Sequence, residues 1–111
     1  MPDGREAYLF QLKNINGIQV ELTNFGAKIV SCCVPDRNGN MDNVVLGYSQ
    51  FEYYLKGQPY LGATIGRVTN RIGKASFTLN NKTWYLTPNQ GHNHLHGGKP
   101  GFDSALWLSG D

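Results

Sequence analysis

Apolar and polar residues alternate over short stretches of the N-terminal half, as they do in β-strands that bury one face. The segment Ile-Gln-Val-Glu-Leu at residues 18–22 shows this alternation most clearly. Asn16-Gly17 is a strong turn signal just before it, and Pro35 closes a later apolar stretch. We therefore predict four strands in this half, at residues 7–12, 18–22, 27–34 and 44–46.

The second half contains the clearest local signal in the chain. Residues 76–79 and 82–86 are rich in β-formers, and they flank Asn80-Asn81. Because asparagine tolerates a positive φ, this pair predicts a hairpin with a two-residue loop. A further strand is predicted at residues 102–108, after a turn that contains proline and glycine.

One short helical turn is predicted between the two halves. Ser49 can act as its N-cap, and Glu52 stands three residues later, which is the spacing of a capping box. Gly57 can end the turn. A helix of this length depends on tertiary contacts for its stability.

Composition narrows the class of protein. The chain has 111 residues, of which 40% are hydrophobic, and its fourteen glycines and six tyrosines favour an all-β domain with tight turns. A formal charge of +2, from scattered lysines and arginines, gives no indication of a nucleic-acid partner. No apolar run reaches the roughly 18 residues that a membrane span needs. The first six residues lack the apolar region of a signal peptide, and we expect Cys32-Cys33 to be reduced thiols. Both features favour a cytoplasmic protein.

The candidate chemistry is concentrated in two segments. The three histidines, His92, His94 and His96, fall within five positions, and an extended backbone would point them to one face. About two dozen residues earlier, Asn70 and Arg71 stand side by side. Imidazole, amide and guanidinium groups suit a polyhydroxylated or anionic small molecule, because they offer both donors and acceptors.

Several interpretations of these residues remain open on this evidence alone. The histidines could supply zinc ligands, but no further ligand is evident from spacing, and they could equally be polar loop residues. His94 or His96 could exchange protons with a sugar, and Arg71 could either hold hydroxyl groups or pair with a carboxylate. The aromatic residues could stack on a sugar ring, although such residues more often form core.

Several motifs in series resemble the aldose 1-epimerase (galactose mutarotase) family. They are Gly66-Arg67-Val68-Thr69-Asn70-Arg71-Ile72, the hairpin at residues 77–86, Asn93-His94-Leu95-His96-Gly97-Gly98, Gly101-Phe102-Asp103 and Leu106-Trp107. The earlier segments Leu22-Thr23-Asn24-Phe25-Gly26-Ala27 and Asp42-Asn43-Val44-Val45-Leu46-Gly47 also resemble its N-terminal strands. The resemblance extends over nearly the whole chain.

This resemblance implies a fold, an activity and a site. Family members are antiparallel β-sandwiches (supersandwiches) that interconvert the α and β anomers of free aldoses such as galactose and glucose, without cofactor or metal. It implies that Asn70 and Arg71 bind sugar hydroxyls. It also implies that His96 contacts the sugar near its ring oxygen and assists ring opening, whereas Arg67 is structural.

The resemblance also implies that part of the site is absent. The family's principal acid, a second histidine, and its base, a glutamate, correspond to no residue here. We therefore expect residues 1–111 to form a single partial domain, the N-terminal third of an epimerase domain, that catalyses little alone. Its partners would be an aldose and a C-terminal portion or another chain. The alternative is a non-catalytic carbohydrate-binding fragment or a truncated product.

Overall fold

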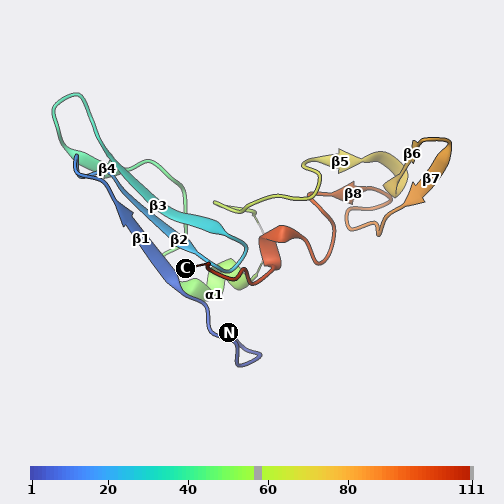
Figure 1. Cartoon of the computed structure of the whole chain (residues 1–111), viewed down its shortest axis with the longest axis horizontal. Coiled ribbons are helices and arrows are strands. Elements are labelled where there is room, and N and C mark those ends of the chain that lie inside the picture. Colours follow the sequence, from blue (N-terminus) through green and yellow to red (C-terminus); the bar gives the residue numbers. More distant parts are fainter. Residues whose placement is uncertain (57–58, 111) are drawn as a thin grey trace. The chain divides into compact units, whose positions relative to one another are not determined.

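The computed structural model describes residues 1–56 and 59–110, and the chain divides into two compact units. Unit 1 comprises Met1–Thr64 and Asp103–Asp111, and unit 2 comprises Ile65–Phe102. Each unit is built from antiparallel strands (Figure 1). Within the described residues, no helix is both long and apolar enough to cross a membrane. The cytoplasmic location stays a prediction.

Unit 1 is organised by one four-stranded antiparallel sheet in the order β1-β2-β3-β4 (Figure 1). Its strands are β1 (Leu9–Lys13), β2 (Gln19–Thr23), β3 (Lys28–Pro35) and β4 (Met41–Asn43). Three of the predicted strands are confirmed, each displaced by one or two residues. The predicted turn at Asn16-Gly17 is confirmed as well, with Gly17 at φ +84°.

The fourth predicted strand, at residues 44–46, is wrong, because the last strand of the sheet ends at Asn43. The Oδ1 atom of Asn43 accepts hydrogen bonds from the backbone N–H groups of Cys32 (2.9 Å) and Val45 (3.1 Å). A side-chain oxygen thus takes the place of a backbone carbonyl at this point, and regular pairing does not continue.

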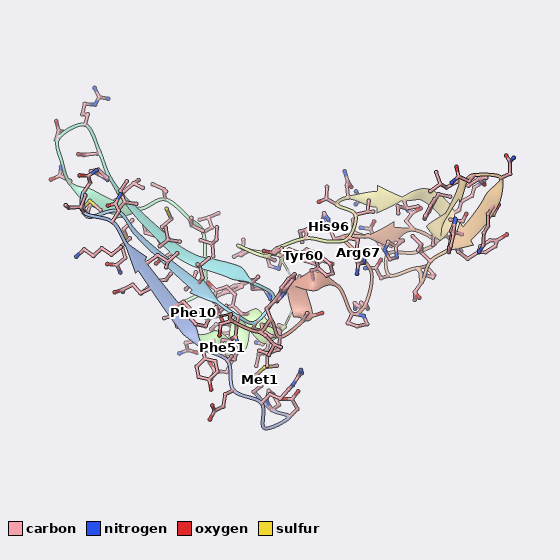
Figure 2. The ribbon with its side chains drawn as sticks, in the orientation of Figure 1. Met1, Phe10, Phe51, Tyr60, Arg67 and His96 are labelled. Carbon is pink, nitrogen blue, oxygen red and sulfur yellow. The ribbon has the colours of Figure 1, made fainter. Side chains whose placement is uncertain are left out.

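The predicted helix exists as α1 (Phe51–Leu55), but its predicted cap is wrong. The N-cap is Gln50 and makes no side-chain capping bond. Gly57, the predicted end, lies outside the described residues. Packing stabilises the helix instead: the Phe51 ring meets the Phe25 ring edge to face at 5.9 Å, and Tyr54 is buried (Figure 2 labels Phe51).

The predicted strand at residues 102–108 is also wrong. This segment begins with a 3-10 turn, η2 (Phe102–Ser104), and continues as irregular chain with one bridge between Leu106 and Phe25. The backbone N–H of Gly26 donates to the Ala105 carbonyl at 2.7 Å. The backbone is therefore paired with the loop after β2 and does not extend the sheet.

Unit 2 contains two short strand pairs (Figure 1). One is the predicted hairpin of β6 (Ser76–Leu79) and β7 (Lys82–Tyr85), which is confirmed. Asn80 and Asn81 have φ values of 51° and 59°, as a type I′ turn requires. The other pair joins β5 (Arg71–Ile72) to β8 (His94–Leu95), and the 3-10 turn η1 (Gly73–Ala75) follows β5.

Candidate functional site

The β5–β8 pair brings the two motifs of the sequence together. Arg71 pairs with Leu95 and Ile72 with His94, so the residue before β5 faces the residue after β8. These two residues are Asn70 and His96, and they exchange two hydrogen bonds. The His96 backbone N–H donates to the Asn70 carbonyl at 3.0 Å, and the Asn70 backbone N–H donates to Nδ1 of the His96 ring at 3.0 Å.

The conformation of His96 overturns the expectation that all three histidines share a face. His96 lies in the left-handed region at φ 51°, and Asn70 does so at φ 60°. Because a left-handed residue departs from the extended alternation, the His96 ring turns toward Asn70. Nδ1 of the ring accepts this hydrogen bond, so in its neutral form the ring carries its own hydrogen on Nε2.

The Arg71 side chain is held by two amide oxygens. Its Nε–H group donates to Oε1 of Gln90 at 2.5 Å, and its Nη1 group donates to Oδ1 of Asn70 at 3.2 Å. Among the described residues, the only ion pair joins Arg5 to Asp3. Arg71 therefore pairs with no carboxylate of the described residues. Arg71 is exposed.

Asn89 fixes the position of β8. Its Oδ1 atom accepts the Leu95 backbone N–H at 2.6 Å, and its Nδ2 group donates to the Leu95 carbonyl at 2.9 Å. One side chain thus satisfies both backbone groups on the outer side of the strand, in the way a neighbouring strand would. This contact holds the residue that pairs with Arg71, and it also fixes the strand that leads into His96.

Two glycines let the backbone pack closely after His96. A Cβ atom at Gly97 would lie 1.7 Å from the Gly66 carbonyl oxygen, and one at Gly98 would lie 2.5 Å from the His94 ring. Both residues also have positive φ, at 88° and 79°. Only glycine fits both the space and the conformation at these two positions.

The other two histidines have different surroundings. Nδ1 of His94 lies 2.8 Å from the Thr87 carbonyl, so this ring nitrogen must donate and carries the hydrogen. His94 is thereby tied to the loop before β8 and packs against Gly98. His92 is exposed. In the part of the chain that the structure describes, no group of three or more potential ligands is placed to hold a metal ion.

Arg67, the first arginine of the motif, has a different environment from Arg71. Its guanidinium lies over the Phe102 ring, 5.5 Å from the centroid, beside a mostly apolar hollow of about 340 Å³ (Figure 2 labels Arg67 and His96). This contact with an aromatic face suits the structural role that the resemblance implies.

The charged residues of unit 2 are all basic. Residues 65–102 include Arg67, Arg71, Lys74, Lys82 and Lys99 but neither aspartate nor glutamate. The candidate site therefore offers hydrogen-bond donors, positive charge and imidazole, and unit 2 supplies no carboxylate that could act as a base.

Sequence reasoning missed Gln90 and Asn89. Both belong to a loop, Pro88-Asn89-Gln90-Gly91, whose only signal in the sequence is its turn-forming composition. We expected a joint role for Asn70, Arg71 and His96. In the structure they form one connected group, because Asn70 is hydrogen-bonded to Arg71 through its side chain and to His96 through its backbone.

Comparison with known proteins gives one consistent result. The family model described as aldose 1-epimerase matches residues 8–109. Galactose mutarotase of Bos taurus is 47% identical over 98 residues, covering 88% of this chain and 28% of that protein. Aldose 1-epimerase of Escherichia coli is 40% identical over 106 residues, covering 96% of this chain and 31% of that protein.

Solved structures are similar as well. A crystal structure of an aldose epimerase homologue from C. elegans superposes with a TM-score of 0.84 at 32% identity, over 93% of this chain and 32% of that one. The crystal structure of galactose 1-epimerase from Lactobacillus acidophilus superposes with a TM-score of 0.78 at 30% identity, over 95% of this chain and 30% of that one. The predicted all-β fold class is confirmed. The chain spans about three tenths of the length of the relatives it matches.

Proposed function

Because this chain belongs to the aldose 1-epimerase family, we propose that it forms the sugar-holding part of an enzyme that interconverts the α and β anomers of a free aldose. Galactose and glucose are the proposed substrates. Residues 1–111 would be the N-terminal third of the catalytic domain. The observation that carries this proposal is the connected group of Asn70, Arg71 and His96.

Each member of the group has a defined role in the proposal. His96, with its hydrogen on Nε2, donates to the ring oxygen of the sugar and assists ring opening. Arg71 donates to hydroxyls through the remaining N–H groups of its guanidinium. Asn70 accepts from Arg71 at Oδ1, which directs its amide hydrogens to a neighbouring hydroxyl.

Mutarotation requires two proton transfers on opposite sides of the sugar. A base removes the proton of the anomeric hydroxyl while an acid protonates the ring oxygen, the C1–O5 bond opens, and the ring recloses on the other face. Unit 2 has no carboxylate, so a carboxylate base must come from outside residues 65–102. We propose that a further histidine and glutamate, from additional residues or another chain, complete this pair.

Galactose titration of the isotope-labelled chain, followed by ¹H–¹⁵N NMR spectra, tests the proposal. We expect shifts at the amides of Asn70, Arg71 and His96, and weaker binding in Arg71→Ala by about tenfold, because a charged donor is lost. Arg5→Ala is the matched control, since Arg5 is an exposed arginine in unit 1. A folded chain whose spectrum galactose leaves unchanged would contradict the proposal.

The absence of a carboxylate from unit 2 supports a second candidate, in which the chain binds a sugar without converting it. Polarimetry on freshly dissolved α-galactose separates the two. Acceleration above the spontaneous rate by this chain alone, lost in Arg71→Ala, would reject the non-catalytic candidate. Binding without acceleration, with activity appearing when a C-terminal portion is added, supports the epimerase.

A further inference from the structure

We propose that Gln90 is a positioning residue of the sugar site, which orients the Arg71 guanidinium through the Arg71 Nε–H group. This inference rests on the proposed function, because it assigns a purpose to Arg71. It adds a residue that does not touch the sugar and acts only through its contact with Arg71.

The two hydrogen bonds of Arg71 determine the orientation of its guanidinium. This group is planar and rigid, so the bond from Nε to Gln90 and the bond from Nη1 to Asn70 fix the plane at two points. The Gln90 bond uses the N–H nearest the aliphatic stem. It therefore fixes the Nε end of the guanidinium and leaves outer N–H groups available to sugar hydroxyls.

The backbone of Gln90 is itself anchored without help from its side chain. Its N–H donates to the Asn93 carbonyl at 3.1 Å, and its carbonyl accepts the Asn93 N–H at 2.9 Å. The preceding residue, Asn89, clamps Leu95, which is the strand partner of Arg71. The loop is thus bound to β8 through Asn89, and β8 pairs with Arg71. The Gln90 side chain adds a direct hydrogen bond from the same loop to Arg71.

The exposure of Arg71 explains why such a link matters. An exposed arginine has many rotamers, and it loses that freedom when it binds a ligand. A guanidinium that is ordered beforehand avoids this loss. Glutamine is suited to the task because its oxygen accepts the bond without cancelling the positive charge, whereas a glutamate would compete with the sugar for that charge.

The test compares two variants of the full chain that differ in the acceptor. Gln90→Met keeps the length of the side chain and removes the acceptor, and Gln90→Glu restores an acceptor. The first readout is the ¹⁵Nε–¹Hε signal of Arg71, identified by its loss in Arg71→Lys. The second is galactose affinity by titration. Gln11→Met, on strand β1 of unit 1, is the matched control.

We expect Gln90→Met to move the Arg71 Nε–H signal, speed its exchange with water and weaken galactose binding about fivefold, the loss of one net hydrogen bond. Gln90→Glu should restore the protected signal but only part of the affinity. A merely structural role would not give this pattern, because the backbone bonds of Gln90 are unchanged in both variants.

An Arg71 Nε–H signal that is absent in the parent chain, or unmoved in Gln90→Met, would overturn the inference. So would Gln90→Met binding galactose as tightly as Gln11→Met. A parent chain that binds no galactose rejects the proposed function, which is a separate result. In that case the NMR signal alone decides whether Gln90 orients Arg71.

Discussion

Lys28 is a buried lysine whose pKa is changed by its surroundings. Its side chain is only 3% exposed, although lysine is among the residues that are seldom buried. The ammonium group donates to the Asp103 carbonyl at 2.5 Å and lies 4.2 Å from the centre of the Phe25 ring. This contact connects the start of β3 to η2. Burial lowers the pKa of Lys28, and the nearby charge of Asp103 partly opposes that effect.

The lowered pKa predicts how stability changes in alkaline solution. The folded state releases the Lys28 proton at a lower pH than the unfolded state, whose pKa is near 10.5. Between these two values the unfolded state binds more protons, so this residue makes the free energy of unfolding rise with pH, by less than about 1.4 kcal/mol per pH unit. Urea denaturation of the parent chain and Lys28→Met across this range measures the difference in slope.

Lys13→Met, which removes an exposed lysine from β1, is the control for that comparison. Its slope should match that of the parent chain. Equal slopes in the parent chain and Lys28→Met would show that Lys28 does not change its proton affinity on folding.

The residues of the site differ in how well sequence could predict them. Asn70, Arg71 and His96 stand in motifs that resemble a known family, and the β5–β8 pair places them together. Gln90 contacts Arg71 across nineteen positions of sequence. A single side-chain contact of that kind leaves no periodic pattern, so the sequence alone could not show it.

At the scale of elements, the sequence predicted structure best where the residues of a turn require a particular backbone conformation. Asn80-Asn81 predicted its hairpin correctly because both residues must take a positive φ. The strands predicted at residues 44–46 and 102–108 failed for another reason. Their apolar residues satisfy the strand pattern, but Asn43 and the loop at Gly26 take up the backbone hydrogen bonds that a strand would need.

The hairpin loop gives a prediction for unit 2. Asn81→Gly should stabilise the hairpin by a few tenths of a kcal/mol, because glycine adopts φ 59° at less cost, and Asn81→Val should destabilise it by about 1–2 kcal/mol. Urea denaturation followed by the fluorescence of Trp84, on β7, measures both. Asn38→Val, in the turn before β4, is a control in unit 1. Equal stability of the glycine and valine variants would contradict the prediction.

At the scale of the whole molecule, little apolar surface is removed from water. Among the described residues, the buried hydrophobic side chains are Phe25, Tyr54 and Ala75. Leucines of the edge strand β1 are well exposed, with Leu9 and Leu12 both at 59%. Unit 1 also has a mostly apolar hollow of about 280 Å³, lined in part by Leu9, Phe51 and Tyr54. Exposed apolar surface of this kind binds hydrophobic dyes and favours association.

We therefore expect the 111-residue chain to enhance the fluorescence of the dye ANS and to self-associate as its concentration rises. Leu12→Lys should reduce both effects, because it places a charge on the edge strand. Lys13→Met adds no charge and should not reduce them. Dye titration and analytical ultracentrifugation provide the measurements. A chain that stays monomeric and leaves the dye dark would show that this surface is not available.

The all-cationic composition of unit 2 has a consequence for any base that completes the site. The charged residues that a glutamate could meet in unit 2 are all basic: Arg67, Arg71 and three lysines. Such surroundings favour the ionised carboxylate, so the base would arrive ready to take a proton at neutral pH. The same field would stabilise negative charge that develops on the sugar oxygen. Both effects weaken as ionic strength rises. The salt dependence of activity in the completed enzyme would therefore measure how much the positive charge of unit 2 contributes.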